Sequence, residues 1–518
     1  MKHPQLILRT LQSMTAILMV AIIVFVMALL DIYPANLLRI KGQHPAQMEV
    51  TNKKVKRPKV TKNVSVQEYL QRGDQAKFNN DLDAAIVAYQ SASEVDPREI
   101  APYEKIGDVY MMQRNYASAK DNFELGRALD AQNANLSVKI ARALIGLRKP
   151  LDARLELQKI DPPTQPSLYY SGIIAAFLNE QEAAKDLLSK SITAGQDETL
   201  KANAQRIFDI YKLFEVTREG EAEYLQAMLA QAFDQNGEYG LAIELAFNAL
   251  KTKHDYRDVW IILGHAFLNE QKWFDAQDAM DKAIQLDASH PAAYFFRGLA
   301  FKNQGKADKA MSDFKQSIEF GWKPVIIAKQ EIADIYFESK DFERAFDAYK
   351  EIVLADSADI NLFVRPMALA INHLNKPDQA MELAKRAFET HKESAMAYNL
   401  MGWAFLAKGD TTNSLKNLKA ATIKDPELSA TYLNLGMLYQ KLGEIDNSRN
   451  SYEKAVSLAE KHGDKSIGDT AKILIDRINS PQVPTGVQVE PLSQTTPAGG
   501  QNPLSAPQTE FMPSLSLQ

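Results

Sequence analysis

The sequence contains no cysteine, and this absence excludes several kinds of site. Without thiols there is no disulfide, no thiolate metal site and no cysteine nucleophile. Common catalytic signatures are missing as well: we find no H-E-x-x-H pair, no glycine-rich phosphate loop and no G-x-S-x-G turn. We therefore predict that the chain is not an enzyme, binds no metal or cofactor and has no evident small-molecule substrate.

Clustered positive charge is also scarce in the body of the chain. The net charge is −5, but residues 1–64 carry +8 and residues 481–518 carry −2, which leaves −11 for residues 65–480. Phosphate recognition needs Lys and Arg gathered on the binding face. The acidic body thus argues against a nucleic-acid partner.

One long hydrophobic run stands at the N-terminus. No residue between Arg9 and Asp31 is charged, and seventeen of the twenty residues 11–30 are apolar. Twenty helical residues span roughly 30 Å, the thickness of the hydrocarbon core of a bilayer. We predict a single membrane-spanning helix here. The alternative, a cleaved signal peptide, is disfavoured because its apolar run is usually about 7–15 residues long and no small-x-small cleavage site follows.

Charges on either side of the run bear on its orientation. Lys2 and Arg9 precede the run. Charges within roughly 15–20 residues of the ends of a membrane helix have most influence on its orientation, and the basic cluster 53–62 begins just beyond that distance. This favours a single-pass protein of the inner (plasma) membrane with its repeats on the extracytoplasmic side. Repeats in the cytoplasm are the alternative, which the basic cluster favours. The cluster itself is either a solvated linker or a contact for anionic lipid headgroups.

An internal repeat dominates residues 65–480. Stretches such as 294–318 and 432–456 carry an aromatic residue, a Gly four positions on, a small residue twelve after the Gly and an aromatic residue sixteen after it. The corresponding small residues of the first helices are Gly73, Gly107, Ala141, Gly172, Ala230, Gly264, Gly298, Ala333, Ala368, Gly402 and Gly436. Their spacings are 34, 34, 31, 58, 34, 34, 35, 35, 34 and 34 residues. The pattern resembles the tetratricopeptide repeat, a helix–turn–helix unit of about 34 residues.

The resemblance implies an all-α fold, a solenoid of eleven helical hairpins preceded by the transmembrane helix. The predicted divisions are the N-terminal tail and transmembrane helix 1–31, a basic linker 32–64, an N-terminal repeat lobe 65–195, an extra inter-lobe helix 196–220, a C-terminal repeat lobe 221–463, a capping helix 464–480 and a tail 481–518. The tail is rich in Pro, Gln, Ser and Thr and is predicted to be disordered. A short recognition segment around Phe511 and Met512 is the alternative for it.

The small residues suggest how the two helices of a hairpin pack. A Gly inside a helix costs about 1 kcal/mol relative to Ala, which close helix packing can offset. We expect the alanine twelve residues later, such as Ala276 or Ala310, to meet this gap. We expect the aromatic residue sixteen positions on, such as Phe314, to fill a larger hole toward the next repeat. Pro366 lies inside the first helix of its repeat and should kink it or delay its start.

In this family the first helix of each hairpin lines the concave face, so the resemblance implies a partner-binding groove there. The candidate groove residues are Ile261, His265, Leu268, Phe295, Leu299, Trp403, Leu406, Leu433 and Met437. Exposed apolar side chains along such a strip would suit an extended or helical peptide. The alternative is that neighbouring helices cover them and that they complete the core. Near the N-terminus the groove positions include Asp74 and Asp108, which favours a basic partner segment there.

These observations predict a membrane-anchored scaffold that binds a protein or peptide partner. Assembly of a cell-envelope complex, such as a secretion, pilus, motor or cell-wall machine, is the favoured process. The alternative is a cytoplasm-facing adaptor that recruits a soluble enzyme or protease to the membrane.

Overall fold

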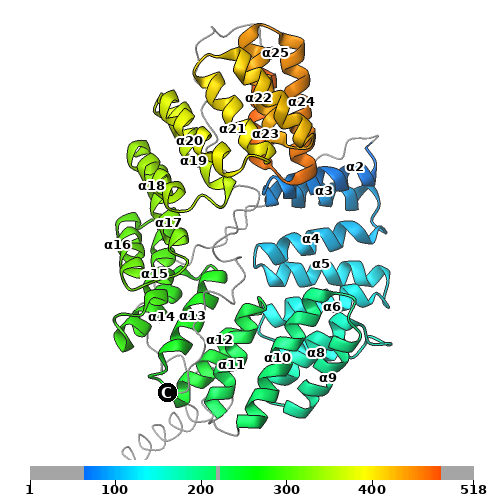
Figure 1. Ribbon diagram of the computed structural model, residues 1–518. Coiled ribbons are helices and arrows are strands. Elements are labelled where there is room, and N and C mark those ends of the chain that lie inside the picture. The colour runs from blue at the N-terminus through cyan, green and yellow to red at the C-terminus, as the bar shows by residue number, and fades with distance from the viewer. Residues whose placement is uncertain (1–63, 218–221, 480–518) are drawn as a thin grey trace, which may run out of the picture. The chain divides into compact units, whose positions relative to one another are not determined.

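The computed structural model describes residues 64–217 and 222–479. Within these residues the chain forms 24 α-helices and no strand (Figure 1). None of the described helices is both long and apolar enough to cross a membrane. The predicted span 11–30 and the predicted tail lie outside the described residues, as does all of the basic linker except Val64.

The helices follow one another as antiparallel pairs. The first four pairs are α2 (Val66–Phe78) with α3 (Leu82–Val95), α4 (Ile100–Met112) with α5 (Tyr116–Leu129), α6 (Ala134–Gly146) with α7 (Pro150–Leu157) and α8 (Gln165–Phe177) with α9 (Gln181–Thr193). The single helix α10 (Glu198–Thr217) follows and occupies the predicted extra segment. Its buried residues Ala204, Ile207 and Tyr211 join the core of the pairs on either side.

Seven further pairs complete the array. They are α11 (Ala222–Gln235) with α12 (Tyr239–Thr252), α13 (Arg257–Asn269) with α14 (Trp273–Leu286), α15 (Pro291–Asn303) with α16 (Ala307–Glu319), α17 (Val325–Glu338) with α18 (Phe342–Ala355), an irregular first helix with α20 (Pro377–Thr390), α21 (Ala395–Ala407) with α22 (Thr411–Lys424) and α23 (Ser429–Leu442) with α24 (Ile445–His462). The last helix, α25 (Lys465–Asn479), packs on α24 and buries Ala471 and Leu474. In the rest of the text, helix A and helix B are the first and second helix of a pair.

Every turn between helix A and helix B contains one residue with a left-handed backbone. It lies seven positions after the small residue of helix A in all eleven pairs. These residues are Asn80, Arg114, Arg148, Asn179, Gly237, Gln271, Gly305, Lys340, Asn375, Gly409 and Gly443, with φ between 50° and 83°. Gly and Asn tolerate this conformation best. In several pairs, an Asp or Asn right after the turn caps helix B, as Asp81 does by accepting a hydrogen bond from the Ala84 amide at 2.9 Å.

The glycines of helix A lie closest to the residue sixteen positions later, and at Gly264 the carbonyl oxygen of Ala276, twelve positions later, would also lie 3.3 Å from an added Cβ. A Cβ added to Gly298 would lie 2.7 Å from Cε1 of Phe314, and one added to Gly402 would lie 2.6 Å from Cγ of Leu418. The aromatic side chain therefore lies over the glycine of its own hairpin. Several of these rings also meet the next repeat, since Lys105 lies over Tyr89 and Lys139 lies over Phe123.

Pro366 disrupts the first helix of the ninth pair, as predicted. That helix is split into a 3₁₀ turn η1 (Ile360–Phe363), a short α19 (Val364–Ala368) and a π-helical turn η2 (Leu369–His373). Proline has no amide hydrogen to donate and its ring crowds the preceding turn. The segment after it is underwound into i→i+5 hydrogen bonding, with the Leu374 amide donating to the Leu369 carbonyl at 3.0 Å.

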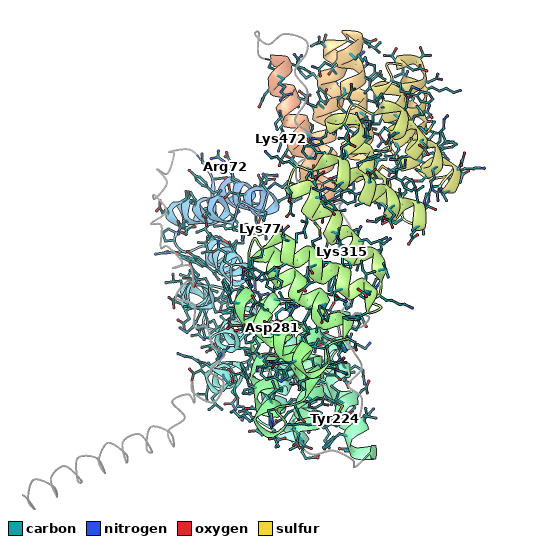
Figure 2. All side chains as sticks on the ribbon, turned by 90° about the vertical axis from the view of Figure 1, so that its left-hand side faces the viewer. Arg72, Lys77, Tyr224, Asp281, Lys315 and Lys472 are labelled. Atoms are coloured by element: carbon teal, nitrogen blue, oxygen red, sulfur yellow. The ribbon has the colours of Figure 1, made fainter. Side chains whose placement is uncertain are left out.

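Ion pairs tie consecutive repeats together beside the apolar core. Arg297 on α15 donates to Asp281 on α14 and to Asp313 on α16, each at 2.7 Å. Figure 2 labels Asp281 amid the side chains of the array. The Asp313 side chain is only 8% exposed, so this pair is shielded from solvent and fixes three successive helices.

Candidate functional site

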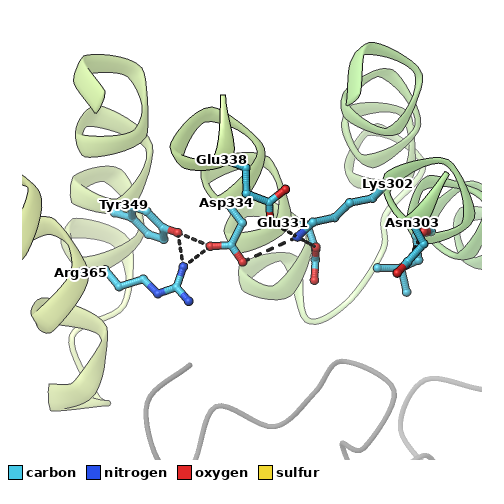
Figure 3. Close-up of polar contacts among 8 residues, drawn as sticks. Lys302, Asn303, Glu331, Asp334, Glu338, Tyr349 and Arg365 are labelled. Atoms are coloured by element: carbon cyan, nitrogen blue, oxygen red, sulfur yellow. Dashed lines mark hydrogen bonds and ion pairs between the residues drawn. The ribbon is translucent and has the colours of Figure 1, made fainter. Parts of the chain in front are cut away.

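The concave positions of helix A carry a recurrent polar contact, which we call the Asp staple. In its fullest form Asp334 on α17 accepts hydrogen bonds from Tyr349 on α18 and Arg365 on α19 (Figure 3). Arg365 also donates to the Tyr349 hydroxyl at 2.6 Å. Because Arg365 belongs to the next repeat, the staple joins two hairpins on the face where a partner is expected.

The N-terminal repeats contain the same contact. Tyr89 donates to Asp74 at 2.7 Å, and Lys105 of the next repeat donates to both oxygens of Asp74 at 2.7 and 3.0 Å. Burial alone would raise the pKa of Asp74, but the hydrogen bonds from Lys105 and Tyr89 outweigh it and lower that pKa. The Asp74 charge is thus already matched within the chain.

A second N-terminal staple uses Lys139. Its ammonium lies 2.6 Å from Asp108 and 2.8 Å from Glu104. The position that Tyr89 holds in the first staple is Phe123 here, and Lys139 lies 5.7 Å from the centre of its ring. The acidic N-terminal groove expected from the sequence is therefore largely neutralised, and the argument for a basic partner segment there is weakened.

Lys302 is the centre of a larger network next to the Asp334 staple (Figure 3). Its Nζ lies 2.9 Å from Glu331, 3.4 Å from Glu338 and 4.0 Å from Asp334. Burial is the main influence on Glu331 and raises its pKa despite the attraction of Lys302. The network links repeats seven and eight through α15 and α17.

Eight of the nine candidate groove residues are buried, which departs from the exposed strip expected of them. Ile261, His265 and Leu268 are between 0% and 3% exposed. They belong to a run of eleven consecutive buried residues in α13, from Asp258 to Leu268. Helix α13 contacts the neighbouring A helices α11 and α15 directly. This arrangement matches the alternative interpretation, in which these side chains complete the core.

His265 has a specific structural partner. Its Nδ1 lies 2.8 Å from Oδ2 and 3.0 Å from Oδ1 of Asp234, whose side chain is 0% exposed. The ring also meets Phe296 edge-on at 4.9 Å between centroids. Burial raises the pKa of Asp234, while His265 opposes that shift. The histidine is therefore engaged within the array.

Phe295 and Leu299 on α15 are 2% and 4% exposed. The Phe295 ring stacks on Trp322 with centroids 4.3 Å apart and planes 11° apart, and it also packs against Phe314 at 5.6 Å. A side chain held between two rings cannot meet a partner without rearrangement. Phe295 is thus a core residue of the seventh repeat.

The last four candidates lie near the C-terminal end of the array. Trp403, Leu406 and Leu433 are 8%, 9% and 5% exposed, and Met437 is half-buried. Leu406 and Met437 share one apolar cluster across α21 and α23. Of the nine residues, Met437 therefore offers the most accessible apolar surface.

Sequence reasoning missed a polar contact between distant repeats. Tyr116 donates to Glu270 at 3.0 Å, Arg114 donates to the Asn269 carbonyl at 3.3 Å, and Arg148 donates to Glu244 at 2.7 Å. The available signal was that two long arginine side chains stand where the turn favours Gly or Asn.

No group of three or more His, Asp or Glu side chains within 64–217 and 222–479 is arranged to hold a metal ion.

Comparisons with known proteins agree with the repeat pattern. Models of the tetratricopeptide repeat match residues 263–323 and 429–462. Lipopolysaccharide assembly protein B of Escherichia coli (strain K12) is 26% identical over 232 residues, covering 42% of this chain and 57% of that protein. Stress-induced-phosphoprotein 1 of Caenorhabditis elegans is 22% identical over 208 residues, covering 38% of this chain and 61% of that protein. The chain thus spans little more than half the length of these relatives.

Among solved structures, the comparison finds yeast Tom70. It has a TM-score of 0.33 and 15% sequence identity, and the match covers 80% of this chain and 97% of that one. Proteins built from tetratricopeptide repeats are typically protein-binding scaffolds without catalytic activity. The described residues of this chain form an all-helical solenoid of hairpins, in which residues 263–323 and 429–462 are tetratricopeptide repeats.

Proposed function

We propose that this scaffold is anchored in the inner membrane by residues 11–30 and that it serves the assembly of a cell-envelope complex. The observation that carries the proposal is the 232-residue similarity to lipopolysaccharide assembly protein B. The uncharged apolar run near the N-terminus is a second, separate observation that supports a membrane anchor. Lipopolysaccharide assembly is accordingly the envelope process we favour, ahead of secretion, pilus, motor or cell-wall assembly.

Topology reporters test the membrane part of the proposal. Alkaline phosphatase fused after residue 480 should be active, because we place the repeats on the extracytoplasmic side. A matched fusion to a reporter that is active only in the cytoplasm should be silent. The reverse pair of results would support the second candidate, a cytoplasm-facing adaptor for a soluble enzyme or protease. The basic cluster 53–62 favours that candidate.

We further propose that the partner contacts the concave face near α21 and α23. Among the nine candidate residues, Trp403, Leu406 and Met437 keep the most accessible surface. Tryptophan is enriched among binding hot spots, and flexible methionine is common at surfaces that adapt to a partner. The other six would support this face from within the core.

A matched pair of substitutions tests this face. Met437→Lys places a charge on the proposed contact, whereas Ile423→Lys places the same charge on an isoleucine that is 83% exposed on α22. Met437→Lys should reduce recovery of envelope partners in affinity purification at least tenfold, and Ile423→Lys should leave it unchanged. Equal loss with both variants, or with neither, would refute the proposed location.

A further inference from the structure

One concave position of helix A changes the sign of its charge in the third repeat. The residue that follows the small residue of helix A is Asp74 in the first repeat, Asp108 in the second and Asp334 in the eighth. In the third repeat the same position holds Arg142 on α6. A guanidinium therefore stands where the Asp staples have a carboxylate.

The donor position of the staple changes at the same point. The lysines of the two N-terminal staples, Lys105 and Lys139, each stand two positions before the small residue of the next helix A. At the corresponding position of α8 the chain has Tyr170. Arg142 and Tyr170 thus occupy the two staple positions between repeats three and four, and neither of them supplies a carboxylate.

Tyr170 supports the guanidinium from one side. The guanidinium carbon of Arg142 lies over the Tyr170 ring, 5.7 Å from its centre. Tyr170 is buried and meets Tyr169 edge-on, with 5.0 Å between the ring centres, and Tyr169 accepts a hydrogen bond from Asn236 at 3.2 Å. A cation over a ring is attracted by the ring face. This leaves most N–H groups at the edge of the guanidinium available to an acceptor.

Arg142 has no carboxylate partner of its own. Within residues 64–217 and 222–479 no Asp or Glu forms an ion pair with its guanidinium, and the side chain is exposed. Tyr170 raises the pKa of Arg142 more than burial lowers it, and Glu238 and Asp108 add to the increase. Asp108, however, lies 2.6 Å from Lys139 and is already matched. The charge of Arg142 therefore remains open to an external anion.

Glu238 is the acidic side chain with the strongest effect on this cation. It stands just before α12 and makes no hydrogen bond to the amides of that helix. Burial raises its pKa to about 7, although Arg142 and Arg114 favour its ionised form. The other ionisable groups that interact with it are Tyr169 and Tyr170 of α8. Near neutral pH a large share of the molecules thus carry Glu238 as a neutral acid, which does not cancel the charge of Arg142.

The chemistry of this position suits a carboxylate. The planar fork of an arginine matches the two oxygens of a carboxylate or a phosphate. Nucleic acids need several clustered cations, whereas residues 65–480 carry a net charge of −11. Arrays of this repeat type present their concave surface to protein partners. An Asp or Glu side chain of a protein is therefore the anion that fits.

We propose that Arg142, held over Tyr170 on the concave side of repeats three and four, binds an Asp or Glu side chain of a partner protein. This contact rests on the proposed scaffold function, since it names the chemistry of one interaction that the partner makes. It requires an acidic partner segment at repeats three and four, opposite in sign to the basic segment that the sequence favoured for the N-terminal groove.

Peptide binding to the purified full-length chain in detergent micelles tests the contact. The probe is a fluorescein-labelled hexaglutamate peptide, and hexalysine with the same label is the probe of opposite charge. Fluorescence anisotropy at pH 6 should show that hexaglutamate binds the parent chain, and Arg142→Gln should weaken this binding at least fivefold. Arg72→Gln, which changes an arginine that is 53% exposed on α2, should leave it unchanged.

Several results would overturn the proposal. They are equal hexaglutamate binding by the parent and by Arg142→Gln, no hexaglutamate binding at all, and tighter binding of hexalysine. Stronger competition by inorganic phosphate than by glutarate would contradict the assignment of a carboxylate. If circular dichroism shows that Arg142→Gln is unfolded, the pH series on the parent chain and on Glu238→Gln decides.

The pH series is a second readout of the same site. Peptide glutamates are ionised at both pH 6 and pH 8, whereas Glu238 changes from mainly neutral to mainly ionised across this range. Ionised Glu238 repels the incoming carboxylate and competes for Arg142, so hexaglutamate should bind the parent several-fold more weakly at pH 8. Glu238→Gln should remove this difference. A difference of the same size in Glu238→Gln would refute the part of the proposal that involves Glu238.

These measurements use no envelope partner, so they separate this contact from the proposed function. Loss of envelope partners in Met437→Lys, together with equal peptide binding by the parent and Arg142→Gln, would remove only the Arg142 contact. The opposite pair of results would remove only the proposed face near α21 and α23.

Discussion

Three identical Gly→Ala substitutions separate three physical effects in this array. Gly298 lies in helix α15 against Phe314, Gly305 lies in the following turn with φ of 73° and nothing within 4 Å of an added Cβ, and Gly240 lies in α12 with its nearest neighbour 3.8 Å away. The added methyl group is the same in all three. Only the steric contact, the backbone conformation and the helix propensity differ.

The expected changes have different signs. At Gly240, the second residue of α12, alanine should raise stability by at most about 1 kcal/mol, the difference in helix propensity for a helix interior. At Gly298 the same gain opposes an overpacking cost of about 1–3 kcal/mol, because the Phe314 ring is fully buried, so we expect a net loss of about 1 kcal/mol. At Gly305 the left-handed backbone costs alanine roughly 1–2 kcal/mol, partly offset by reduced freedom in the unfolded chain, which again predicts a loss of about 1 kcal/mol.

Hydrogen exchange is the suitable assay because repeat arrays open locally. A loss of about 1.4 kcal/mol corresponds to tenfold faster exchange in amides protected by that opening. Peptides from α15 and α16 should exchange several-fold faster in Gly298→Ala and Gly305→Ala, and peptides from α12 should exchange more slowly in Gly240→Ala. Equal effects at all three positions would refute the reasoning, since it attributes each change to a different local cause.

Three other predictions concern buried or half-buried polar groups. His265→Ala leaves the fully buried Asp234 carboxylate without its partner and should cost about 3–5 kcal/mol in urea unfolding, whereas leucine at both positions should recover most of that loss. Tyr211→Phe and Thr431→Val remove buried hydroxyls without a hydrogen-bond partner and should each raise the free energy of unfolding by about 1 kcal/mol; a loss would indicate a bound water. Burial raises the pKa of Glu238 from 4.5 to about 7, so its contribution to stability is complete below pH 4.5 and is lost as the pH rises through about 7. Glu238→Gln should flatten the stability curve in that window, and an unchanged curve would contradict the assignment.

The repeat itself was predictable from the sequence because its signal lies in local spacing. Each small residue of helix A marks one hairpin, and the spacing of 58 residues between Gly172 and Ala230 revealed the additional helix α10. Pro366 likewise predicted the broken first helix of the ninth repeat, because the hydrogen bond that proline cannot donate disrupts only the helix that contains it.

The exposure of the groove residues was not predictable in the same way. Ile261 and Leu268 occupy concave positions of helix A, yet the tightness of the curvature decides whether adjacent A helices leave those positions open. The curvature of the array follows from small rotations between successive repeats. The spacing of the small residues along the sequence does not predict those rotations. The pairing of Asp74 with Lys105 was missed for a related reason, because the two residues stand in different repeats.

The polar contact between distant repeats illustrates a further limit. Arg114 and Glu270 are 156 positions apart, and no repeat pattern relates one to the other. Only the left-handed turn position of Arg114 was visible locally. Contacts between distant repeats therefore need the three-dimensional arrangement of the array.

The central claim is that the concave face near α23 binds a protein partner. A photocrosslinking amino acid placed at Met437 of the full-length chain in intact cells tests this most directly, with Ile423 on the exposed side of α22 as the control position. We predict a discrete crosslinked protein at position 437 that is absent at position 423 and that disappears when Trp403→Ala is added. The absence of any crosslink at 437, or the same crosslinked protein at both positions, would contradict the account.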